Sequence, residues 1–424
     1  MNHNLTHLHP YPFAKMATLL ANSSPSALYS EIKLGIGEPK HAPPAFVLDA
    51  LKENLDKICL YPTTNGTFEL RQTIAHWLEK RFFLHHVDAN TEVLPVMGTR
   101  EAIFSFAQAV IDHNADTENT ETSLKDSTES NIESNQPSSQ HYNPVIVMPN
   151  PFYQIYEGAA ILAQATPYFV PCTLDNDFKG DYRAVPREIW ARTQLLFVCS
   201  PNNPTGSVMT LDDWEMLIRL SDQYGFIIAS DECYSELYFD VAPIGLLQAC
   251  TALGRDNFKN CVVFHSLSKR SNLPGLRSGF IAGDANILQS YLQYRTYQGC
   301  AMPIPHQLAS IAAWQDEKHV AQNRTLYREK FALWMTELGE LLDLRMPEAG
   351  FYFWIKVPEQ FDCDDEMFVK ALYEQANIHA LAGRYLSREV EGKNPGQGYV
   401  RIALVASVEE SREAISRIRK LLNA

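Results

Sequence analysis

Short, unbroken apolar runs recur along the chain and constrain its fold more than any other feature. Four of them, at residues 145–148, 195–198, 226–229 and 261–264, are separated by roughly the length of a helix and its turns. Strands buried on both faces are apolar without interruption, and strands that alternate with helices are typical of a parallel sheet. The sequence therefore predicts an α/β fold with a mainly parallel sheet covered by helices.

One of the intervening helices can be predicted directly. Thr210 is a good N-cap, Asp213 stands three positions further on, and Gly225 supplies the stop. Four apolar residues between them, Leu211, Trp214, Leu217 and Ile218, share one helical face. A helix between the second and third strands completes a β-α-β unit of the usual length.

Composition excludes several classes of protein. No apolar run approaches the ~18 residues of a membrane-spanning helix. The chain carries 36 Lys and Arg against 50 Asp and Glu, a net charge of −14, and has no basic run, which argues against nucleic acid or membrane lipid as a partner. Residues 1–20 do not read as a secretory signal, so we expect a cytoplasmic protein.

Cysteine spacing and short motifs exclude further chemistries. The eight cysteines never form a C-x-x-C pair, which favours reduced, buried thiols over zinc ligands or disulfides, and we predict no metal site. H-E-x-x-H, the P-loop pattern and G-x-S-x-G are all absent. A metalloprotease, a P-loop nucleotide hydrolase and a simple serine hydrolase are therefore disfavoured.

One segment, residues 113–143, departs from the globular pattern. It is rich in Asn, Ser, Thr, Glu and Asp and has no Phe or Trp. So little apolar surface cannot offset the entropy of ordering, and we interpret the segment as a flexible acidic insertion within a domain. We predict a large domain over residues 43–298, and a smaller α/β domain built from residues 1–42 and 299–424 with strands at 351–355 and 399–404.

Polar residues follow three of the predicted strands where each one ends. Asn203 follows the second run, Asp231 and Tyr234 the third, and Lys269 the fourth. Ligands of open α/β sheets bind in the crevice outside the carboxyl ends of the strands. The fold therefore delivers these four side chains to one edge of the sheet.

The same residues carry a family resemblance. Asn203-Pro-Thr-Gly206, Asp231 to Tyr234, and Ser266 to Lys269 with Arg277 eight residues later resemble the motifs of fold type I pyridoxal-phosphate aminotransferases, in the same order. The resemblance covers most of the chain outside the acidic insertion. It implies that pyridoxal 5'-phosphate is the cofactor.

The resemblance also implies catalytic roles. Lys269 would form the imine with the cofactor and later move the substrate proton, which requires an amine whose pKa is lowered by burial and positive charge. Asp231 would pair with the protonated pyridine nitrogen, and Tyr234 and Asn203 would donate to the phenolic oxygen. A helix-cap role for Asp231, a packing role for Tyr234 and a turn role for Asn203 are the alternatives.

Further matches concern the cofactor's phosphate and ring. Gly98, Thr99 and Arg100 open a predicted helix and resemble the family's phosphate loop, which Ser266 and Arg277 would complete. Tyr153 resembles the aromatic residue that stacks on the pyridine ring, although such a residue can also be simple loop packing.

Four residues are implied in substrate binding and assembly. Arg401, in a short predicted strand, resembles the arginine that binds the substrate α-carboxylate, and Gly37 would allow close backbone approach beside it; Asn203 would share this task. A solvent-facing strand arginine is the alternative for Arg401. Tyr61 matches the tyrosine that reaches the phosphate in the neighbouring subunit, which implies a homodimer with shared active sites.

Longer blocks, including residues 8–13, 36–41, 266–277 and 294–302, resemble one branch of the family, the proteobacterial N-succinyldiaminopimelate aminotransferases of lysine biosynthesis. The implied reaction moves the amino group of glutamate onto N-succinyl-2-amino-6-oxopimelate. The residues that would recognise the remote succinyl end are open. The cationic nominees are Lys40, Arg100, Arg270 and Arg295, each with a structural role as the alternative.

Other functions share most of these residues. An aspartate, aromatic or alanine aminotransferase would keep every cofactor contact and differ only in the distal pocket. A carbon–sulfur lyase would also keep the lysine. A regulator that binds the cofactor without turnover would need a DNA-binding module, for which the ~40 residues before the Gly35–Gly37 loop are too few.

Overall fold

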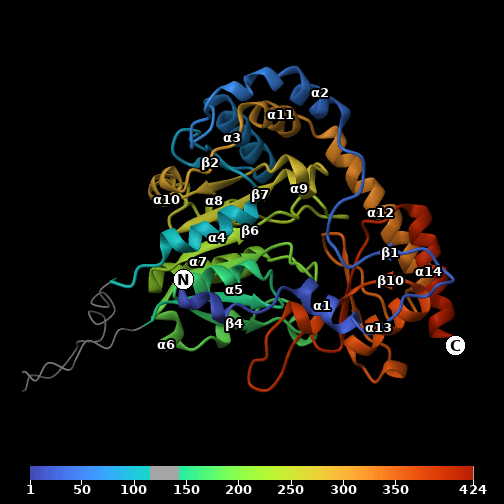
Figure 1. The fold of residues 1–424 in the computed structure, drawn as a ribbon. Coiled ribbons are helices and arrows are strands. Elements are labelled where there is room, and N and C mark those ends of the chain that lie inside the picture. Colours follow the sequence, from blue (N-terminus) through green and yellow to red (C-terminus); the bar gives the residue numbers. More distant parts are fainter. Residues whose placement is uncertain (115–142, 424) are drawn as a thin grey trace, which may run out of the picture.

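The computed structural model describes residues 1–114 and 143–423, and it has the predicted α/β architecture (Figure 1). The prediction of a flexible acidic insertion falls mainly on residues 115–142, which lie outside the described residues. Within the described part, no helix is long and apolar enough to cross a membrane.

The largest sheet has seven strands in the order β2-β8-β7-β6-β5-β3-β4. β8 runs antiparallel to both of its neighbours, and the remaining neighbouring pairs are parallel. Their bounds are β2 (Val93–Val96), β3 (Val145–Asn150), β4 (Thr166–Pro171), β5 (Thr193–Cys199), β6 (Ile227–Asp231), β7 (Cys261–Ser266) and β8 (Gly279–Gly283). The four apolar runs are thus confirmed as strands β3, β5, β6 and β7, with Phe226 just ahead of β6.

Alternate residues of each strand enter two different apolar layers. In β3, Val145 and Val147 pack in one hydrophobic cluster, and Ile146 and Met148 pack in another. The first layer contains α2 (Ala45–Glu53), α3 (Phe68–Phe82), α7 (Leu211–Tyr224), α8 (Leu246–Ala252) and α11 (Ile304–Gln315). The second contains α4 (Thr99–Val110), α5 (Ile155–Leu162) and α10 (Ala285–Gln298). Burial on both faces explains the unbroken apolar runs.

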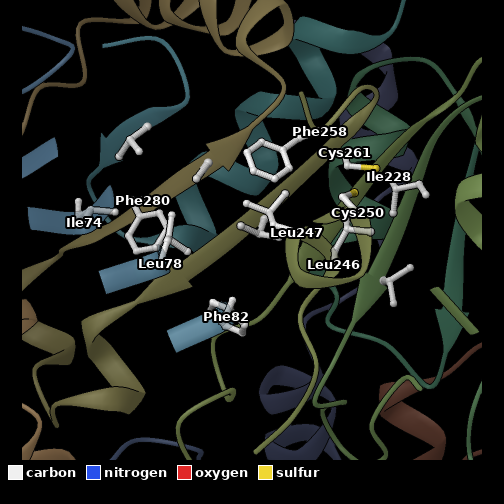
Figure 2. Packing of buried hydrophobic residues seen from close by; sticks show 14 of the residues in the cluster. Ile74, Leu78, Phe82, Ile228, Leu246, Leu247, Cys250, Phe258, Cys261 and Phe280 are labelled. Carbon is white, nitrogen blue, oxygen red and sulfur yellow. The ribbon is translucent and has the colours of Figure 1, made fainter. Parts of the chain in front are cut away.

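Figure 2 shows part of the first layer, where side chains from separate elements meet over the sheet. Phe82 of α3, Leu247 of α8 and Phe280 of β8 are each no more than 2% exposed. Their contacts hold α3 and α8 against strands β7 and β8, and so fix the ends of the strands that carry the polar residues.

Helix α7 has the predicted ends. The Thr210 side chain accepts a hydrogen bond from the Asp213 amide at 3.2 Å, and the Asp213 carboxylate accepts one from the Thr210 amide at 2.8 Å. Gly225 ends the helix with a φ of 81°, a conformation that glycine adopts without strain. The capping box and the glycine stop are both confirmed.

A second hydrophobic cluster joins the two ends of the chain. Met16, Ile32 and Leu34 pack with residues between 331 and 421. Its strands are β9 (Tyr352–Lys356), β11 (Leu381–Ala382) and β12 (Tyr399–Ala403) in the antiparallel order β11-β12-β9, and the parallel pair β1 (Ile32–Lys33) and β10 (Ile378–His379). Its helices are α1 (Pro12–Leu20), α12 (Lys318–Leu338), α13 (Asp365–Ala376) and α14 (Val408–Leu422). The strands predicted at 351–355 and 399–404 correspond to β9 and β12.

Helix α11 packs on the side of the large sheet. It contacts α2 and α3, and Ala309 and Trp314 belong to the first apolar layer (Figure 1). The predicted division at residue 298 puts this helix in the smaller domain, whereas its packing favours a division after Gln315. The domain boundaries themselves stay a prediction.

All eight cysteines are free thiols. Four are buried, among them Cys199 at the end of β5 and Cys261 at the start of β7, but Cys59 and Cys363 are exposed. The expectation of buried thiols therefore holds for the strand cysteines and is wrong for these two, which lie in surface segments.

Candidate active site

A cavity of about 550 Å³ lies at the carboxyl ends of the parallel strands. Its lining comes from strand ends of the large sheet, the Ile36–Glu38 loop and β12 of the smaller unit. It brings together most of the predicted site residues: Gly37, Thr99, Arg100, Tyr153, Asn203, Asp231, Tyr234, Ser266, Lys269, Arg277 and Arg401. Of the predicted set, Gly98 and Tyr61 do not line it.

Lys269 lies in the short helix α9 (Leu267–Arg270), directly after β7. Its Nζ donates a hydrogen bond to the Gly37 carbonyl and stands 5.3 Å from the centre of the Phe351 ring. Burial, helped by the positive charge of Arg401, lowers the pKa of Lys269 to about 8. About a tenth of the amine is therefore neutral at pH 7 and about half at pH 8, and this neutral form can act as a nucleophile or base.

Asp231 ends β6 and is buried, at 5% exposure. Its Oδ2 accepts a hydrogen bond from Tyr156 Oη at 2.9 Å and its Oδ1 one from the Cys233 amide at 3.2 Å. Burial raises the pKa of Asp231, and no cation pairs with it in the described part of the chain. A buried carboxylate in this position suits a protonated ring nitrogen, which is the partner that pyridoxal phosphate would offer.

The start of α4 and the turn after α9 form a cradle for an anion. Gly98 has a φ of 86°, and a side-chain carbon there would lie 2.2 Å from Arg277 Nη2, so only glycine lets this arginine approach. The Ser268 amide donates to Ser266 Oγ at 3.1 Å, and both serines line the cavity. Free helix amides, hydroxyls and a guanidinium are the donors that a phosphate requires.

Arg401 is 4% exposed and is held by neutral acceptors. Its Nη1 donates to Asn203 Oδ1 at 2.9 Å and its Nη2 to the Gly35 carbonyl at 2.7 Å. Its Nε is buried and has no partner among the described residues. A buried guanidinium that faces a cavity without an acidic partner suits the carboxylate of a substrate.

Tyr234 and Tyr352 meet over Arg401. Their hydroxyls are 3.0 Å apart, and the Arg401 guanidinium lies 4.4 Å from the centre of the Tyr352 ring. Burial raises the pKa of both phenols, so they stay protonated and can donate hydrogen bonds into the cavity. A side chain at position 37 would collide with Tyr352 Oη, so glycine is what allows the backbone to approach this hydroxyl so closely.

The outer part of the cavity is lined by Arg100, Tyr153 and Tyr11. Arg100 donates from Nε to Tyr153 Oη and, at 3.3 Å, from Nη2 to Tyr11 Oη. Desolvation, with some help from the phenol of Tyr11, raises the pKa of Tyr153. Tyr153 therefore remains a neutral ring at the wall of the cavity, as a stacking role requires.

The structure separates the four cationic nominees for the remote substrate end. Arg270 and Arg295 are buried in ion pairs, with Glu317 at 2.6 Å and Glu101 at 2.8 Å respectively, so they serve packing rather than the cavity. Lys40 is exposed and does not line the cavity. Arg100 is the one of the four that reaches the cavity.

Three contributors were missed by sequence reasoning. Tyr352 is followed in β9 by three apolar residues, Phe353 to Ile355, so the sequence did not distinguish its hydroxyl from the packing of an apolar strand. Tyr156, the donor to Asp231, follows Tyr153 by three residues, a helical spacing that could have suggested a shared direction. Tyr11 reaches the cavity from the N-terminal segment, far from the other residues in sequence.

Tyr61 stands apart from this arrangement. It is fully exposed, in the segment between α2 and α3, and does not line the cavity of its own chain. Within one chain, Tyr61 therefore makes no contribution to the lining of the cavity.

Comparisons with known proteins agree with this geometry. The family model described as aminotransferase class I and II matches residues 29–116 and 140–418. The chain is similar to an LL-diaminopimelate aminotransferase of Aquifex aeolicus, with 31% identity over 92% of this chain and 91% of the relative. It is similar to the crystal structure of an aminotransferase from Neisseria meningitidis, with 47% identity, a TM-score of 0.89, and coverage of 99% and 100%. It also resembles a probable N-succinyldiaminopimelate aminotransferase from Thermus thermophilus, with 25% identity, a TM-score of 0.79, and coverage of 97% and 100%.

The lowered pKa of Lys269 predicts how its amine reacts in the cofactor-free protein. Only the neutral amine attacks an aldehyde, so the rate of covalent cofactor uptake should rise about fivefold from pH 7 to pH 8 and level off above pH 9. Stopped-flow absorbance of the mixing reaction measures this rate. Replacing Arg401 by Gln removes a positive neighbour and should displace the midpoint to higher pH; a midpoint near 10.5 in the wild type would contradict the assignment.

Proposed function

Because the chain belongs to the class I and II aminotransferases, and so is a pyridoxal-phosphate-dependent enzyme, we propose that it transfers the amino group of glutamate to N-succinyl-2-amino-6-oxopimelate. The products are N-succinyl-LL-2,6-diaminopimelate and 2-oxoglutarate. The observation that carries the proposal is the convergence of a buried amine, Lys269, a buried acid, Asp231, and a buried carboxylate receptor, Arg401, on one cavity.

The residues divide the work of the reaction. The bound cofactor supplies an electrophilic aldehyde carbon and an electron-withdrawing ring. Asp231 holds the proton on the ring nitrogen, and Tyr234 and Asn203 donate toward the phenolic oxygen. Lys269, as a free amine, would take the proton from the substrate Cα and give it back on the far side of the substrate nitrogen. The two half-reactions use one site in turn, so we expect ping-pong kinetics.

The binding residues supply positioning. Arg401 binds the α-carboxylate in a two-point contact, supported by Asn203 and by the Gly37 loop that approaches without a side chain. Gly98, Thr99, Ser266 and Arg277 hold the cofactor phosphate at the start of α4. Tyr153 covers the ring. These roles assign each residue to the phosphate or the ring that pyridoxal phosphate would place in the cavity.

The substrate class follows from charge and relatives. The proposed substrate carries one carboxylate at its reacting end and others on its remote arm, so the cavity needs a second cation besides Arg401. Arg100 supplies it at the outer wall, where its described partners are the neutral phenols of Tyr153 and Tyr11. The cavity volume lies within the range of small-molecule sites. The named T. thermophilus relative supports the succinylated substrate.

The A. aeolicus relative favours a second candidate, LL-diaminopimelate without the succinyl group. Such a substrate has a free ammonium at its remote end, which would be repelled by Arg100 and attracted by an acid. Glu38 lines the cavity and is the acid that could receive it. The two candidate substrates therefore differ in the side chain that would recognise their remote end: Arg100 for the succinylated substrate and Glu38 for LL-diaminopimelate.

The substrate test runs the reaction from the diaminopimelate side with 2-oxoglutarate. We expect kcat/KM for N-succinyl-LL-2,6-diaminopimelate to exceed that for LL-diaminopimelate by at least about tenfold, because a charge-assisted contact to the remote carboxylate contributes about 1.5–3 kcal/mol. Arg100→Gln should narrow this preference, whereas Lys40→Gln, outside the cavity, should preserve it. A preference for LL-diaminopimelate would favour the second candidate, and activity with neither, but with aspartate or alanine, would contradict both.

We further propose that the enzyme is a homodimer in which Tyr61 completes the site of the neighbouring subunit. Exposed apolar residues lie on both sides of this tyrosine in the chain, from the segment after α2 to the first residue of α3. They are Leu55 (52% exposed), Ile58 (73%), Leu60 (57%) and Phe68 (49%). Exposed apolar residues gathered in one segment are typical of an interaction surface, and a second copy of the chain would cover them.

Mixed dimers test the shared site. Lys269→Ala and Tyr61→Ala subunits are each expected to be nearly inactive alone. After unfolding and refolding together they should regain about one quarter of wild-type activity, because half of the dimers are mixed and each has one intact site. No recovery would mean that Tyr61 acts within its own subunit, and full activity of Tyr61→Ala alone would mean that Tyr61 has no role in the site. Mixing Lys269→Ala with Asp231→Ala is the control. Both residues line the cavity of one chain, so each site of a mixed dimer carries one of the two substitutions and no activity should be regained.

A further inference from the structure

Lys330 is a buried amine that the proposed reaction does not use. It lies in α12, is 1% exposed, and forms no ion pair within the described residues. Its Nζ donates to the Leu404 carbonyl at 3.0 Å and lies 2.7 Å from His41 Nε2. Burying a lysine ammonium without an acidic partner costs folding free energy. The hydrogen bonds of Lys330 offset part of this cost, so we asked which segments they connect.

Further hydrogen bonds connect His41 to the turn that carries Lys269. His41 Nδ1 is 2.8 Å from Asn323 Oδ1, and Asn323 Nδ2 donates to the Lys269 carbonyl at 3.2 Å. A lysine ammonium can only donate, so His41 Nε2 accepts and its Nδ1 carries the hydrogen. Asn272 Nδ2 also donates to Asn323 Oδ1, at 3.0 Å, which agrees with this orientation of the amide. Each of these hydrogen bonds therefore pairs a donor with an acceptor.

The same three side chains tie together segments that border the cavity. His41 ends the 35–41 loop, whose Gly35 carbonyl accepts from Arg401 and whose Gly37 carbonyl accepts from Lys269. Leu404 follows Arg401 by three residues along β12 and its extension. We propose that Lys330, His41 and Asn323 form a positioning relay that holds the Lys269 turn, the 35–41 loop and the end of β12 in register around the cavity.

Aromatic packing supports the relay. The Tyr327 ring lies 4.6 Å from the His41 ring and 5.4 Å from that of Phe351, centre to centre. Phe351 in turn lies beside Lys269 Nζ. The Tyr327 and Phe351 rings stack, and the His41 ring packs against Tyr327 at a tilt, so a change at His41 reaches the lysine through the backbone and through the rings.

The charges around the relay favour a neutral imidazole. Burial lowers the pKa of His41, opposed by its Asn323 contact and helped by Lys330. Burial also lowers the pKa of Lys330 to about 8; the charged groups that act on it are Glu410, Lys40 and Glu329. The groups that act on Lys269 are Cys233, Arg401, Glu38 and Arg100. A protonated imidazole would point Nε2–H at the ammonium of Lys330 and break the relay.

Substitutions at His41 distinguish its hydrogen bond to Asn323 from its hydrogen bond to Lys330. His41→Phe removes both hydrogen bonds, whereas the amide of His41→Asn keeps a donor near the Nδ1 position. We expect His41→Phe and Lys330→Met to lower kcat at least about tenfold with KM for glutamate within about twofold, and His41→Asn to recover most of the loss. His379→Phe, a half-buried histidine paired with Glu31 outside this network, is the matched control and should retain wild-type values.

A second readout uses the cofactor-free protein. Reductive methylation of Lys269, followed by peptide mass spectrometry across pH, gives the midpoint at which its amine becomes reactive. We expect His41→Phe and Lys330→Met to raise this midpoint, because a loosened turn admits water and restores the amine toward its ordinary pKa. Unchanged kcat and midpoint in both variants, or His41→Asn as impaired as His41→Phe, would overturn the relay. If His41→Phe does not fold, Lys330→Met and His41→Asn decide the question.

The relay rests on the proposed role of Lys269, and the wild type separates the two failures. If pyridoxal phosphate and borohydride label Lys269 in the wild type while the variants behave like it, only the relay fails. If the wild type is not labelled at Lys269, the proposed function fails as well.

Discussion

The burial of one amine at the carboxyl end of β7 is the constraint on which the rest of the site depends. Lys269 is useful only if part of it is neutral, and water would keep it charged. The covered sheet buries the strand and turn that carry Lys269, with Leu267 in the first apolar layer, and the Gly37 carbonyl accepts a hydrogen bond from the amine. Burial in the fold is thereby the main cause of the lowered pKa of Lys269.

The same burial sets the charge pattern of the cavity. The chain as a whole carries −14, yet its cavity is lined by guanidinium groups of Arg277 and Arg401 that lack acidic partners in the described residues. Asp231 is the opposite case, a carboxylate without a cation. Ligands with two acidic ends and a protonated ring would satisfy all of these groups at once, which is why the site agrees with an amino-acid substrate and a pyridine cofactor.

Much of the fold was predictable because its signals are local. Continuous apolar runs located β3, β5, β6 and β7, and the Thr210–Gly225 caps located α7. Asn203, Asp231, Tyr234 and Lys269 were predictable because they follow strand ends, and the other predicted cavity residues came from the family resemblance. Side chains whose roles depend on distant partners were not predictable: Tyr352 reads as part of an apolar strand, and the Lys330–His41 contact joins residues 289 positions apart. Arg270 and Arg295 could not be excluded as ligands until their buried ion pairs were seen.

The most direct test of the central claim is to incubate the purified protein with pyridoxal phosphate, reduce it with borohydride and map the modified residue by peptide mass spectrometry. A single stable adduct on Lys269, absent from Lys269→Ala and prevented when glutamate is added before reduction, is the predicted result. An adduct spread over exposed lysines, or none at all, would contradict the account.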